Sequence, residues 1–434
     1  MRTDLVIVGA GPAGLVAAAA ATAEGLEVTV VDERLAAGGS VDGALGASAR
    51  DPDAAWLMPP LGARDAANGR IERLRERATA ATLLTDALVW GLFPGWTLAV
   101  TRGGRTRRID AAQVILATGS YVARPPFIGH ALTGVLTPLG LARALEEGRI
   151  AAGARVAVLG DDAFADEIAE TLTERGAAPV ALLAERPRPS PHPVLVLAAP
   201  SVARGGERLE TLDLELVGGE RATLDVEWLV IAGPRSVASE LAHMAGCDHR
   251  FDGYEAGFRP VRGRDGATSV AGIFVAGSLA GAQGYDASER SGAVAGLAAA
   301  VRAGRAPAER LEALLADAPP ASAPPPARIP LAYRAVDAAS TDVACHCIGT
   351  TFADVAAVVK GGARSIDDVK RQAKAGMGPC QGRDCHRTVV RLLATVGDVD
   401  VATLRPMRTR PPVRPVTARA MFEEPDIEKH EVSA

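Results

Sequence analysis

The chain has 434 residues, which is too long for one compact core and predicts more than one domain. Hydrophobic residues make up 48% and charged residues 23% of the sequence, which is ordinary globular usage and excludes a largely disordered chain. The net charge of -5, with arginines interleaved among acids, offers no basic stripe and therefore excludes nucleic acid as an expected partner.

The N-terminus enters an apolar strand at residues 4–8, without the basic start and cleavage site of a signal peptide. The alanine-rich run from Leu15 to Ala23 is short and ends at Glu24, so it predicts a first helix of a nucleotide-binding fold. No segment reaches transmembrane length. Four of the five cysteines fall between Cys345 and Cys385, unlike a secreted disulfide framework. We therefore expect a cytoplasmic protein without a transmembrane segment and with a metal at the cysteine cluster.

Residues 5–31 follow the pattern strand, glycine turn, helix, strand, which predicts one βαβ unit. Its turn, residues 9–14, reads Gly-Ala-Gly-Pro-Ala-Gly, and Asp32 closes the second strand where a ribose-binding acid is expected. Glycine at 9 and 11 lets the backbone approach a pyrophosphate, and the helix N-terminus supplies free N–H groups for it. The unit therefore predicts a bound dinucleotide, and a merely glycine-rich tight turn is the alternative.

Further strands and helices are predicted in chain order. Helices are expected at 70–78, 163–174 and 293–302, and strands at 96–100, 114–117, 155–159, 180–183, 228–231 and 272–276. The unit at 155–183 repeats the βαβ plan, but its turn reads Gly160-Asp161-Asp162-Ala163-Phe164-Ala165. An aspartate at 162 brings bulk and like charge against a pyrophosphate, so we expect no NAD(P)H here and a structural relic instead.

The composition shifts to alanine and proline between residues 306 and 330, which predicts a semi-rigid linker. After it, Thr351 and Ser365 each have an acid three residues on, the pattern of a capped helix start. The prolines of the tail from residue 404 to 415 rule out a helix there and predict an extended segment.

The four clustered cysteines form a C-x-C pair and a C-x4-C pair, separated by 32 residues: Cys345, Cys347, Cys380 and Cys385. Four thiolates fit a 2Fe-2S cluster. Tetrahedral zinc is the alternative, although zinc pairs are usually two to four residues apart and C-x-C is tight for that. With four cysteines present, His346 and His386 are expected to face solvent or bond to sulfur, and Cys247 to be a buried apolar residue.

Three segments together resemble the flavoproteins with two dinucleotide-binding domains: the turn at 9–14, residues 114–120 (Val-Ile-Leu-Ala-Thr-Gly-Ser), and residues 268–278, which end in Val-Ala-Gly-Ser. In that family the N-terminal turn holds FAD. The family usually has an acid where Ser278 stands, and a neutral hydroxyl there weakens the expected hold on the ribityl chain. The resemblance implies an FAD site formed by Gly9, Gly11, Pro12, Ala13, Gly14, Asp32, Glu33, Thr118, Gly119, Gly277 and Ser278.

Residues 375–382, Ala-Gly-Met-Gly-Pro-Cys-Gln-Gly, resemble the bacterioferritin-associated-ferredoxin-like 2Fe-2S domain. With the remaining motifs, including the closing Arg-Pro-Pro-Val-Arg-Pro at 410–415, the whole chain resembles the FAD/2Fe-2S alpha (A) subunits of heteromeric amino-acid dehydrogenases and oxidases, of the D-hydroxyproline dehydrogenase, opine oxidase and hydrogen cyanide synthase type. The resemblance implies an oxidoreductase subunit that carries no catalytic residue of its own. It also implies that the amino acid or secondary amine (hydroxyproline, proline, sarcosine, opine or glycine type) is oxidised on an amino-acid-oxidase-like partner subunit.

The resemblance also leaves room for an FMN at a subunit interface and for a small ferredoxin-like subunit, and it does not name the electron acceptor. The expected fold is α/β, with two Rossmann-like domains of the glutathione-reductase type and a small helical 2Fe-2S domain. Two other functions stay open, a stand-alone NAD(P)H-dependent FAD oxidoreductase and an assembly subunit that has lost FAD. The predicted domains are FAD-binding, 1–122 and 264–305; degenerate NAD(P)-binding-like, 123–263; linker, 306–335; 2Fe-2S, 336–398; and tail, 399–434.

Overall fold

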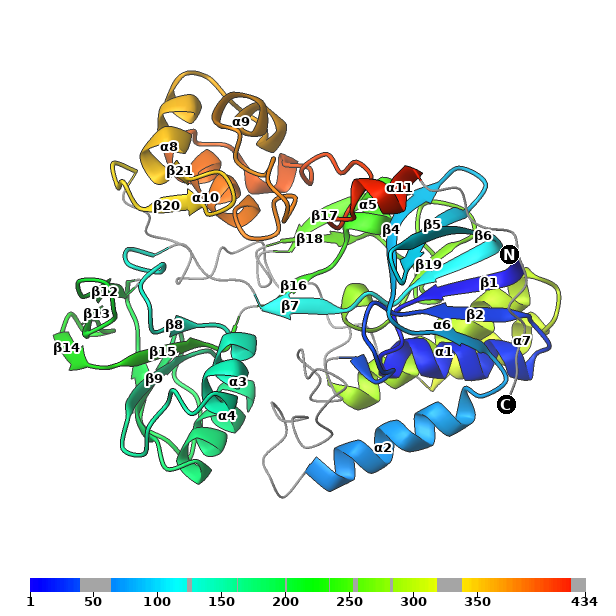
Figure 1. Ribbon diagram of the computed structural model, residues 1–434, viewed down its shortest axis with the longest axis horizontal. Coiled ribbons are helices and arrows are strands. Elements are labelled where there is room, and N and C mark those ends of the chain that lie inside the picture. Colours follow the sequence, from blue (N-terminus) through cyan, green and yellow to red (C-terminus); the bar gives the residue numbers. More distant parts are fainter. Residues whose placement is uncertain are drawn as a thin grey trace.

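The computed structural model describes residues 1–39, 64–122, 127–161, 163–199, 201–233, 235–252, 257–281, 284–317 and 338–422. Figure 1 shows three units: a large sheet with helices at the right, a smaller sheet with helices at the lower left, and a helical unit at the upper left. In the described residues no helix is long and apolar enough to cross a membrane.

The large unit is built on a seven-stranded sheet in the order β3-β2-β1-β6-β5-β4, with β19 paired to β6. Strands β3, β2, β1, β6 and β19 run parallel, and β4 and β5 join antiparallel. Every residue of β2 is buried, as expected for a parallel strand covered on both faces. The strands are β1 (Arg2–Val8), β2 (Val28–Val31), β3 (Thr82–Leu84), β4 (Ala87–Phe93), β5 (Thr97–Arg102), β6 (Arg105–Leu116) and β19 (Ile273–Val275).

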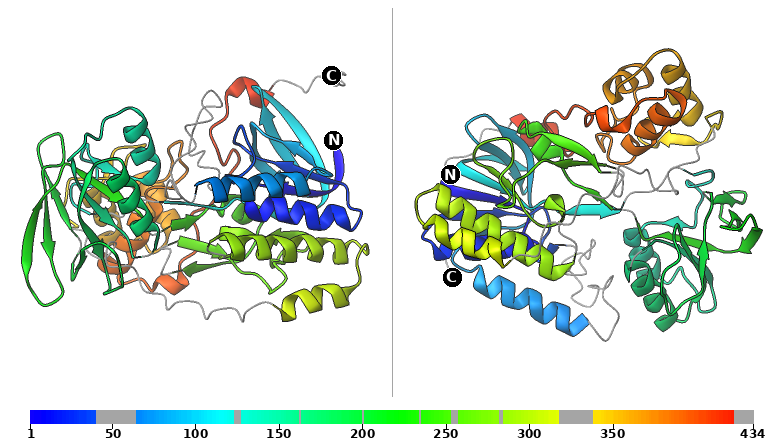
Figure 2. Two further views of the ribbon diagram at one scale, coloured as in Figure 1. Left: turned by 90° about the horizontal axis from the view of Figure 1, so that it is seen from below. Right: turned by 180° about the vertical axis from the view of Figure 1, so that it is seen from behind.

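Helices cover both faces of this sheet. One apolar core lies under α1 (Pro12–Ala23), α6 (Tyr285–Arg302) and α2 (Arg64–Arg77), and Figure 2 shows α1 and α6 side by side. A second core lies on the opposite face, under the short helix α5 (Glu240–Met244) and the 3₁₀ helix η4 (Gly277–Ala280). The hairpin of β17 (His249–Asp252) and β18 (Gly257–Pro260) extends from α5 toward the helical unit.

The second unit has a five-stranded parallel sheet in the order β11-β10-β9-β15-β8. Helices α3 (Pro138–Glu146) and α4 (Ala163–Glu174) cover one face, and a three-stranded antiparallel sheet covers the other. The antiparallel pair β7 (Ser120–Val122) and β16 (Arg235–Val237) joins this unit to the first. The other strands are β8 (Val135–Leu136), β9 (Arg155–Leu159), β10 (Ala178–Ala184), β11 (Val194–Val196), β12 (Val202–Arg204), β13 (Thr211–Glu215), β14 (Arg221–Asp225) and β15 (Trp228–Ile231).

The helical unit contains β20 (Val343–Cys345), β21 (Thr350–Thr351), α8 (Phe352–Lys360), α9 (Ile366–Ala373) and α10 (His386–Val396). Thr351 and Ser365 each form a capping box with the acid three residues on, which confirms both predicted helix starts. Its core also takes in Phe251 and Phe258 of the β17–β18 hairpin, so this unit packs on the large one.

The α/β fold class with a small additional domain is confirmed, and several boundaries predicted from the sequence are wrong. The predicted linker contains α7 (Ala308–Ala316), whose Leu311 and Leu314 pack on the core beneath α6. The predicted tail contains η6 (Val401–Thr403) and α11 (Ala418–Phe422), although residues between them are extended or bent. Val237, Leu241 and Cys247 belong to the core of the large unit, so the chain returns to that unit well before residue 264.

Candidate cofactor sites

The turn between β1 and α1 has the backbone geometry of a dinucleotide-binding turn. Gly9 has a φ of +109°, and a Cβ placed on it would lie 2.3 Å from the carbonyl oxygen of Ala117. A side chain at residue 9 would therefore displace the backbone that follows the neighbouring strand β6. Pro12 begins α1, no side chain caps its N-terminus, and its first turn contains no acid. The first amides of α1 are therefore free of a side-chain acceptor and suit a pyrophosphate.

Asp32 lies at the end of β2, is buried, and faces the same turn. Its Oδ2 accepts a hydrogen bond from the amide of Ala10 at 2.5 Å, and its Oδ1 accepts one from the amide of Arg34 at 2.8 Å. Burial raises the pKa of Asp32, and the two amide hydrogen bonds oppose that shift. Glu33, the neighbouring residue predicted to contact FAD, has its Oε1 3.2 Å from Nη2 of Arg414 in the C-terminal tail. Asp32 therefore faces the turn, whereas Glu33 forms an ion pair with the tail.

The later FAD-motif residues converge on the same edge of the sheet. Thr118 follows β6, and its hydroxyl donates to the carbonyl of Ala238 at 2.7 Å. Gly119 has a φ of +73°, and a Cβ placed on it would meet no heavy atom within 4 Å. Gly277 lies against α1, where a Cβ on it would be 2.8 Å from the Cβ of Ala13, and its amide donates to Ser291 Oγ at 3.1 Å. Ser278 is half-buried in η4. The structure thus brings Gly9, Ala13, Asp32, Thr118 and Gly277 to one end of the sheet.

The second βαβ unit differs at the corresponding turn. Asp162 lies outside the described residues, but Asp161 is described, and its Oδ1 accepts a hydrogen bond from the amide of Glu185 at 2.6 Å. Asp166 in the first turn of α4 binds Arg188 through Oδ2 at 2.5 Å and accepts from the hydroxyl of Ser190 at 2.6 Å. These bonds lower the pKa of Asp166, although its burial acts in the opposite direction. Two carboxylates therefore hold the loop after β10 against the turn where a nucleotide phosphate would bind.

The four predicted metal-ligating cysteines lie together in two pairs. The thiol of Cys345 interacts with that of Cys385, and Cys347 interacts with Cys380. The first pair is buried, with each residue 1% exposed, whereas Cys347 is exposed. Among the described residues, no three Cys, His or carboxylate side chains converge closely enough for one metal ion. A 2Fe-2S cluster needs two thiolates on each of two irons, and the four cysteines of this domain provide that number.

Backbone amides surround the buried cysteine sulfur. The contact with Cys385 and hydrogen bonds from the amides of Gly376 and Ile348 lower the pKa of Cys345 to about 6, against the effect of burial. A Cβ on Gly378 would lie 2.1 Å from the Cβ of Cys347, so only glycine fits at this point of the loop. Amide donors that favour a thiolate and a glycine loop packed on the cysteines are features that an anionic cluster requires.

The two histidines next to the cysteines, His346 and His386, make different contacts. His346 Nε2 lies 3.9 Å from Asp384 Oδ2, and its ring packs edge-on against His130. His386 is half-buried, and its Nδ1 lies 3.0 Å from the carbonyl oxygen of Gly382. Cys247 is 4% exposed within an apolar core, which confirms its assignment as a buried small residue.

Sequence reasoning missed two glycines that position the FAD motif. A Cβ on Gly292 would lie 2.1 Å from the carbonyl oxygen of Ala13, and one on Gly296 would lie 2.4 Å from that of Ala17. These glycines let α6 pack directly on α1 and bring Ser291 to Gly277. The signal was available, since a Gly-x-x-x-Gly helix face opposite an alanine-rich helix is typical of close helix packing.

Comparison with known proteins agrees with both candidate sites. Residues 3–195 match the pyridine nucleotide-disulphide oxidoreductase family, and residues 343–395 match the BFD-like 2Fe-2S binding domain. The A subunit of opine oxidase from Agrobacterium tumefaciens (strain Ach5) is 28% identical over 95% of this chain and 90% of that protein. The HcnB subunit of hydrogen cyanide synthase from Pseudomonas aeruginosa is 27% identical over 96% of this chain and 97% of that protein.

Among solved structures, L-proline dehydrogenase from P. horikoshii superimposes with a TM-score of 0.73 at 22% identity, over 98% of this chain and 80% of that one. Thioredoxin reductase from T. acidophilum superimposes with a TM-score of 0.53 at 18% identity, over 70% of this chain and 99% of that one. At these identities the likeness shows the fold alone.

The fold is that of the two-dinucleotide-domain flavoproteins, which are oxidoreductases, and the small C-terminal domain matches the BFD-like 2Fe-2S model. More narrowly, the chain is related along nearly its whole length to the opine oxidase A subunits and to HcnB, which confirms the resemblance drawn from the sequence.

Proposed function

We propose that this chain is the electron-transfer subunit of a heteromeric flavin dehydrogenase or oxidase whose partner subunit oxidises an amino acid or a secondary amine. In that reaction a CH–NH group loses two electrons and two protons to become an imine on the partner. The two electrons then pass through this chain to an electron acceptor, for which a redox dye can substitute in an activity assay. Bound FAD can take up electrons in pairs and release them singly, and a 2Fe-2S cluster passes them one at a time.

The closed second turn is the observation that carries this proposal. Asp161 and Asp166 hold the loop after β10 over the turn at the start of α4. A carboxylate in the first turn of a helix repels a phosphate at the site where the helix would otherwise attract it. NAD(P)H therefore does not bind at the second turn and does not supply the electrons. A donor on another subunit supplies them instead, in keeping with the subunit names of the relatives.

We assign FAD to the first turn and a 2Fe-2S cluster to the two cysteine pairs. Gly9, Gly11, Pro12, Ala13 and Gly14 would line the pyrophosphate, with the remaining predicted contacts Asp32, Glu33, Thr118, Gly119, Gly277 and Ser278 around them. Of these, Glu33 is engaged by Arg414 and is the weakest assignment. Cys345 and Cys385 would bind one iron, and Cys347 and Cys380 the other. The proposal includes an amino-acid-oxidase-like partner, an FMN at the subunit interface and a small ferredoxin-like subunit.

The test is to purify the chain anaerobically, alone and with the subunits encoded beside it, and to record absorption spectra with flavin, iron and zinc quantified per chain. We expect flavin bands and a broad iron-sulfur shoulder. In the complex, a cyclic or secondary amino acid should bleach both, and NADH should not. Bleaching of the isolated chain by NADH would support a stand-alone reductase instead. Iron without flavin would support an assembly subunit, and zinc without iron would contradict the cluster assignment.

A further inference from the structure

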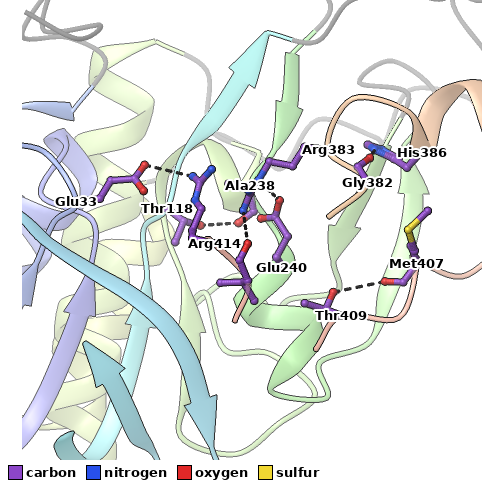
Figure 3. A network of polar contacts seen from close by, with 11 residues as sticks. Glu33, Thr118, Ala238, Glu240, Gly382, Arg383, His386, Met407, Thr409 and Arg414 are labelled. Carbon is purple, nitrogen blue, oxygen red and sulfur yellow. Dashed lines mark hydrogen bonds and ion pairs between the residues drawn. The ribbon is translucent and has the colours of Figure 1, made fainter. Parts of the chain in front are cut away.

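The loop between Cys380 and Cys385 contacts the FAD-binding unit through a largely buried ion pair. Arg383 Nε lies 2.6 Å from Glu240 Oε1, and their side chains are 12% and 17% exposed. The two atoms are close without the alignment of a hydrogen bond, so the contact is an ion pair. Glu240 begins α5, and Arg383 lies between two cysteines that we assign to the cluster. The pair therefore connects the two cofactor regions directly (Figure 3).

On the FAD side, Glu240 is held close to a flavin-motif residue. Ala238, two residues before Glu240, accepts a hydrogen bond from the hydroxyl of Thr118 at 2.7 Å. The amide of Ala238 donates to the carbonyl of Gly119 at 3.0 Å. Figure 3 shows Thr118, Ala238, Glu240 and Arg383 in sequence across the boundary between the units. A shift of Glu240 would therefore disturb the hydrogen bonds that Ala238 makes with Thr118 and Gly119 of the flavin motif.

On the cysteine side, the C-terminal tail holds Arg383 in place. Arg383 Nη2 donates to the carbonyl of Val413 at 3.1 Å, and the amide of Val413 donates to the carbonyl of Trp90 in β4 at 2.9 Å. Val413 is 2% exposed in the core of the FAD-binding unit. Earlier in the tail, Met407 fills the space next to Gly376 and Gly382 of the cysteine loop. The tail thus packs on both units and meets the ion pair at their boundary.

A second, buried guanidinium lies close to this boundary. Arg387 of α10 is 2% exposed, and none of its guanidinium nitrogens has a hydrogen-bond partner in the described structure. Its guanidinium lies 5.8 Å from the ring centroid of Tyr121 in β7. Burial is the main cause that raises the pKa of Tyr121, and the charges of Glu240, Arg387 and Arg383 also act on it, so these three charged groups lie in one neighbourhood. Glu240 is ion-paired with Arg383.

We propose that Glu240 and Arg383 are a positioning pair that fixes the cysteine loop on the FAD-binding unit and so sets the rate of electron transfer between bound FAD and the cluster. The step moves one electron from reduced FAD to the oxidised cluster, and its rate falls steeply as the two separate. This inference rests on the proposed function for its redox part. Its structural part, the docking of the loop, does not depend on substrate or partner.

The first test is hydrogen exchange on the purified full chain, with the variants Glu240→Gln and Arg383→Met. Removing one member of a buried pair leaves the other charge uncompensated. We expect the amides of residues 380–385 and 235–240 to exchange several-fold faster in both variants. The matched control is Arg371→Met, which removes an arginine from an exposed pair with Asp368 in the same unit. Unchanged exchange in Glu240→Gln and Arg383→Met would overturn the proposal.

The second test measures electron transfer in chains that contain flavin and iron at the wild-type ratio. After rapid photochemical reduction of the flavin, bleaching of the cluster band should be several-fold slower in both variants and unchanged in Arg371→Met. The charge-reversed double variant, Glu240→Arg with Arg383→Glu, should recover part of the rate. Unchanged bleaching despite faster exchange would overturn the redox part of the proposal. If the wild-type chain binds no flavin or no iron, the proposed function fails, whereas the exchange result still decides whether the pair docks the loop.

Discussion

The two βαβ units of this chain have the same local architecture and different side chains at the helix N-terminus. The first turn of α1 contains no acid and no capping side chain, so its amides are free. The first turn of α4 contains Asp166, which is bound to Arg188 and Ser190, and Asp161 binds the amide after β10. Strand order and helix placement alone therefore do not make a nucleotide site, because the few groups at the turn decide whether the helix amides are open to an anion.

The largest effect is expected from Gly9→Ala, compared with Gly160→Ala at the equivalent position. At residue 9 a Cβ meets the carbonyl oxygen of Ala117 at 2.3 Å with a φ of +109°, whereas at residue 160 it meets the methyl groups of Ala232 at 2.9 Å and Ala165 at 3.0 Å. Gly9→Ala should lose FAD and about 3 kcal/mol of stability, and Gly160→Ala should keep FAD and lose about 1 kcal/mol. Flavin-to-protein ratios and urea unfolding measure both. Equal losses of flavin and stability in the two variants would contradict the assignment of FAD to the first turn alone.

A smaller effect is expected from Asp32→Asn. An amide can still accept from Ala10 or Arg34, but it loses the charge-assisted bonds to these amides and to a ribose. FAD should bind about tenfold more weakly, which corresponds to about 1.4 kcal/mol. Flavin release in a dilution series measures the affinity. Asp161→Asn serves as the control and should leave FAD affinity unchanged, so a loss there would contradict the assignment of FAD to the first turn.

Asp166→Asn should cost about 1 kcal/mol at pH 7, because it leaves Arg188 partly buried without its carboxylate. The folded-state pKa of Asp166 lies below its ordinary value of 3.8. Its stabilising contribution is therefore present above that pH and is lost as the pH falls through the folded-state pKa. Thermal unfolding of wild type and variant should differ at pH 7, and the difference should shrink as the pH falls below 3.8 and through the folded-state pKa. A difference that persists at low pH would show that the lost contact is not electrostatic.

The smallest effect is expected from Asp161→Asn, at about 0.5 kcal/mol, because an asparagine oxygen can still accept from the amide of Glu185. NADH should still fail to reduce the flavin, since Asp166 remains in the first turn of α4. The measurements are urea unfolding and NADH-dependent flavin bleaching. NADH-dependent bleaching in this variant would show that the charge of Asp161 alone had closed the second turn.

The sequence predicted α4 with both of its bounds and the starts of α8 and α9, because periodicity and hydroxyl–acid caps are local signals. It was less successful where long-range packing decides. Helix α7 was taken for linker because prolines follow it closely, yet Leu311 and Leu314 have a core to pack on. Helix α6 begins at Tyr285, eight residues before the predicted start at 293, in a stretch where charged residues interrupt the apolar pattern.

By itself, the sequence indicated the residues to which we assign the two cofactors. The glycines of the first turn, Asp32 and the four cysteines are recognisable because phosphate approach and metal ligation require particular residue types at fixed spacings. Only the tertiary structure decided how these groups are brought together. The sorting of thiols into Cys345–Cys385 and Cys347–Cys380, and the pairing of Arg383 with Glu240, join residues from 33 to 143 positions apart. No local pattern records such contacts, because they depend on how separately folded units pack against each other.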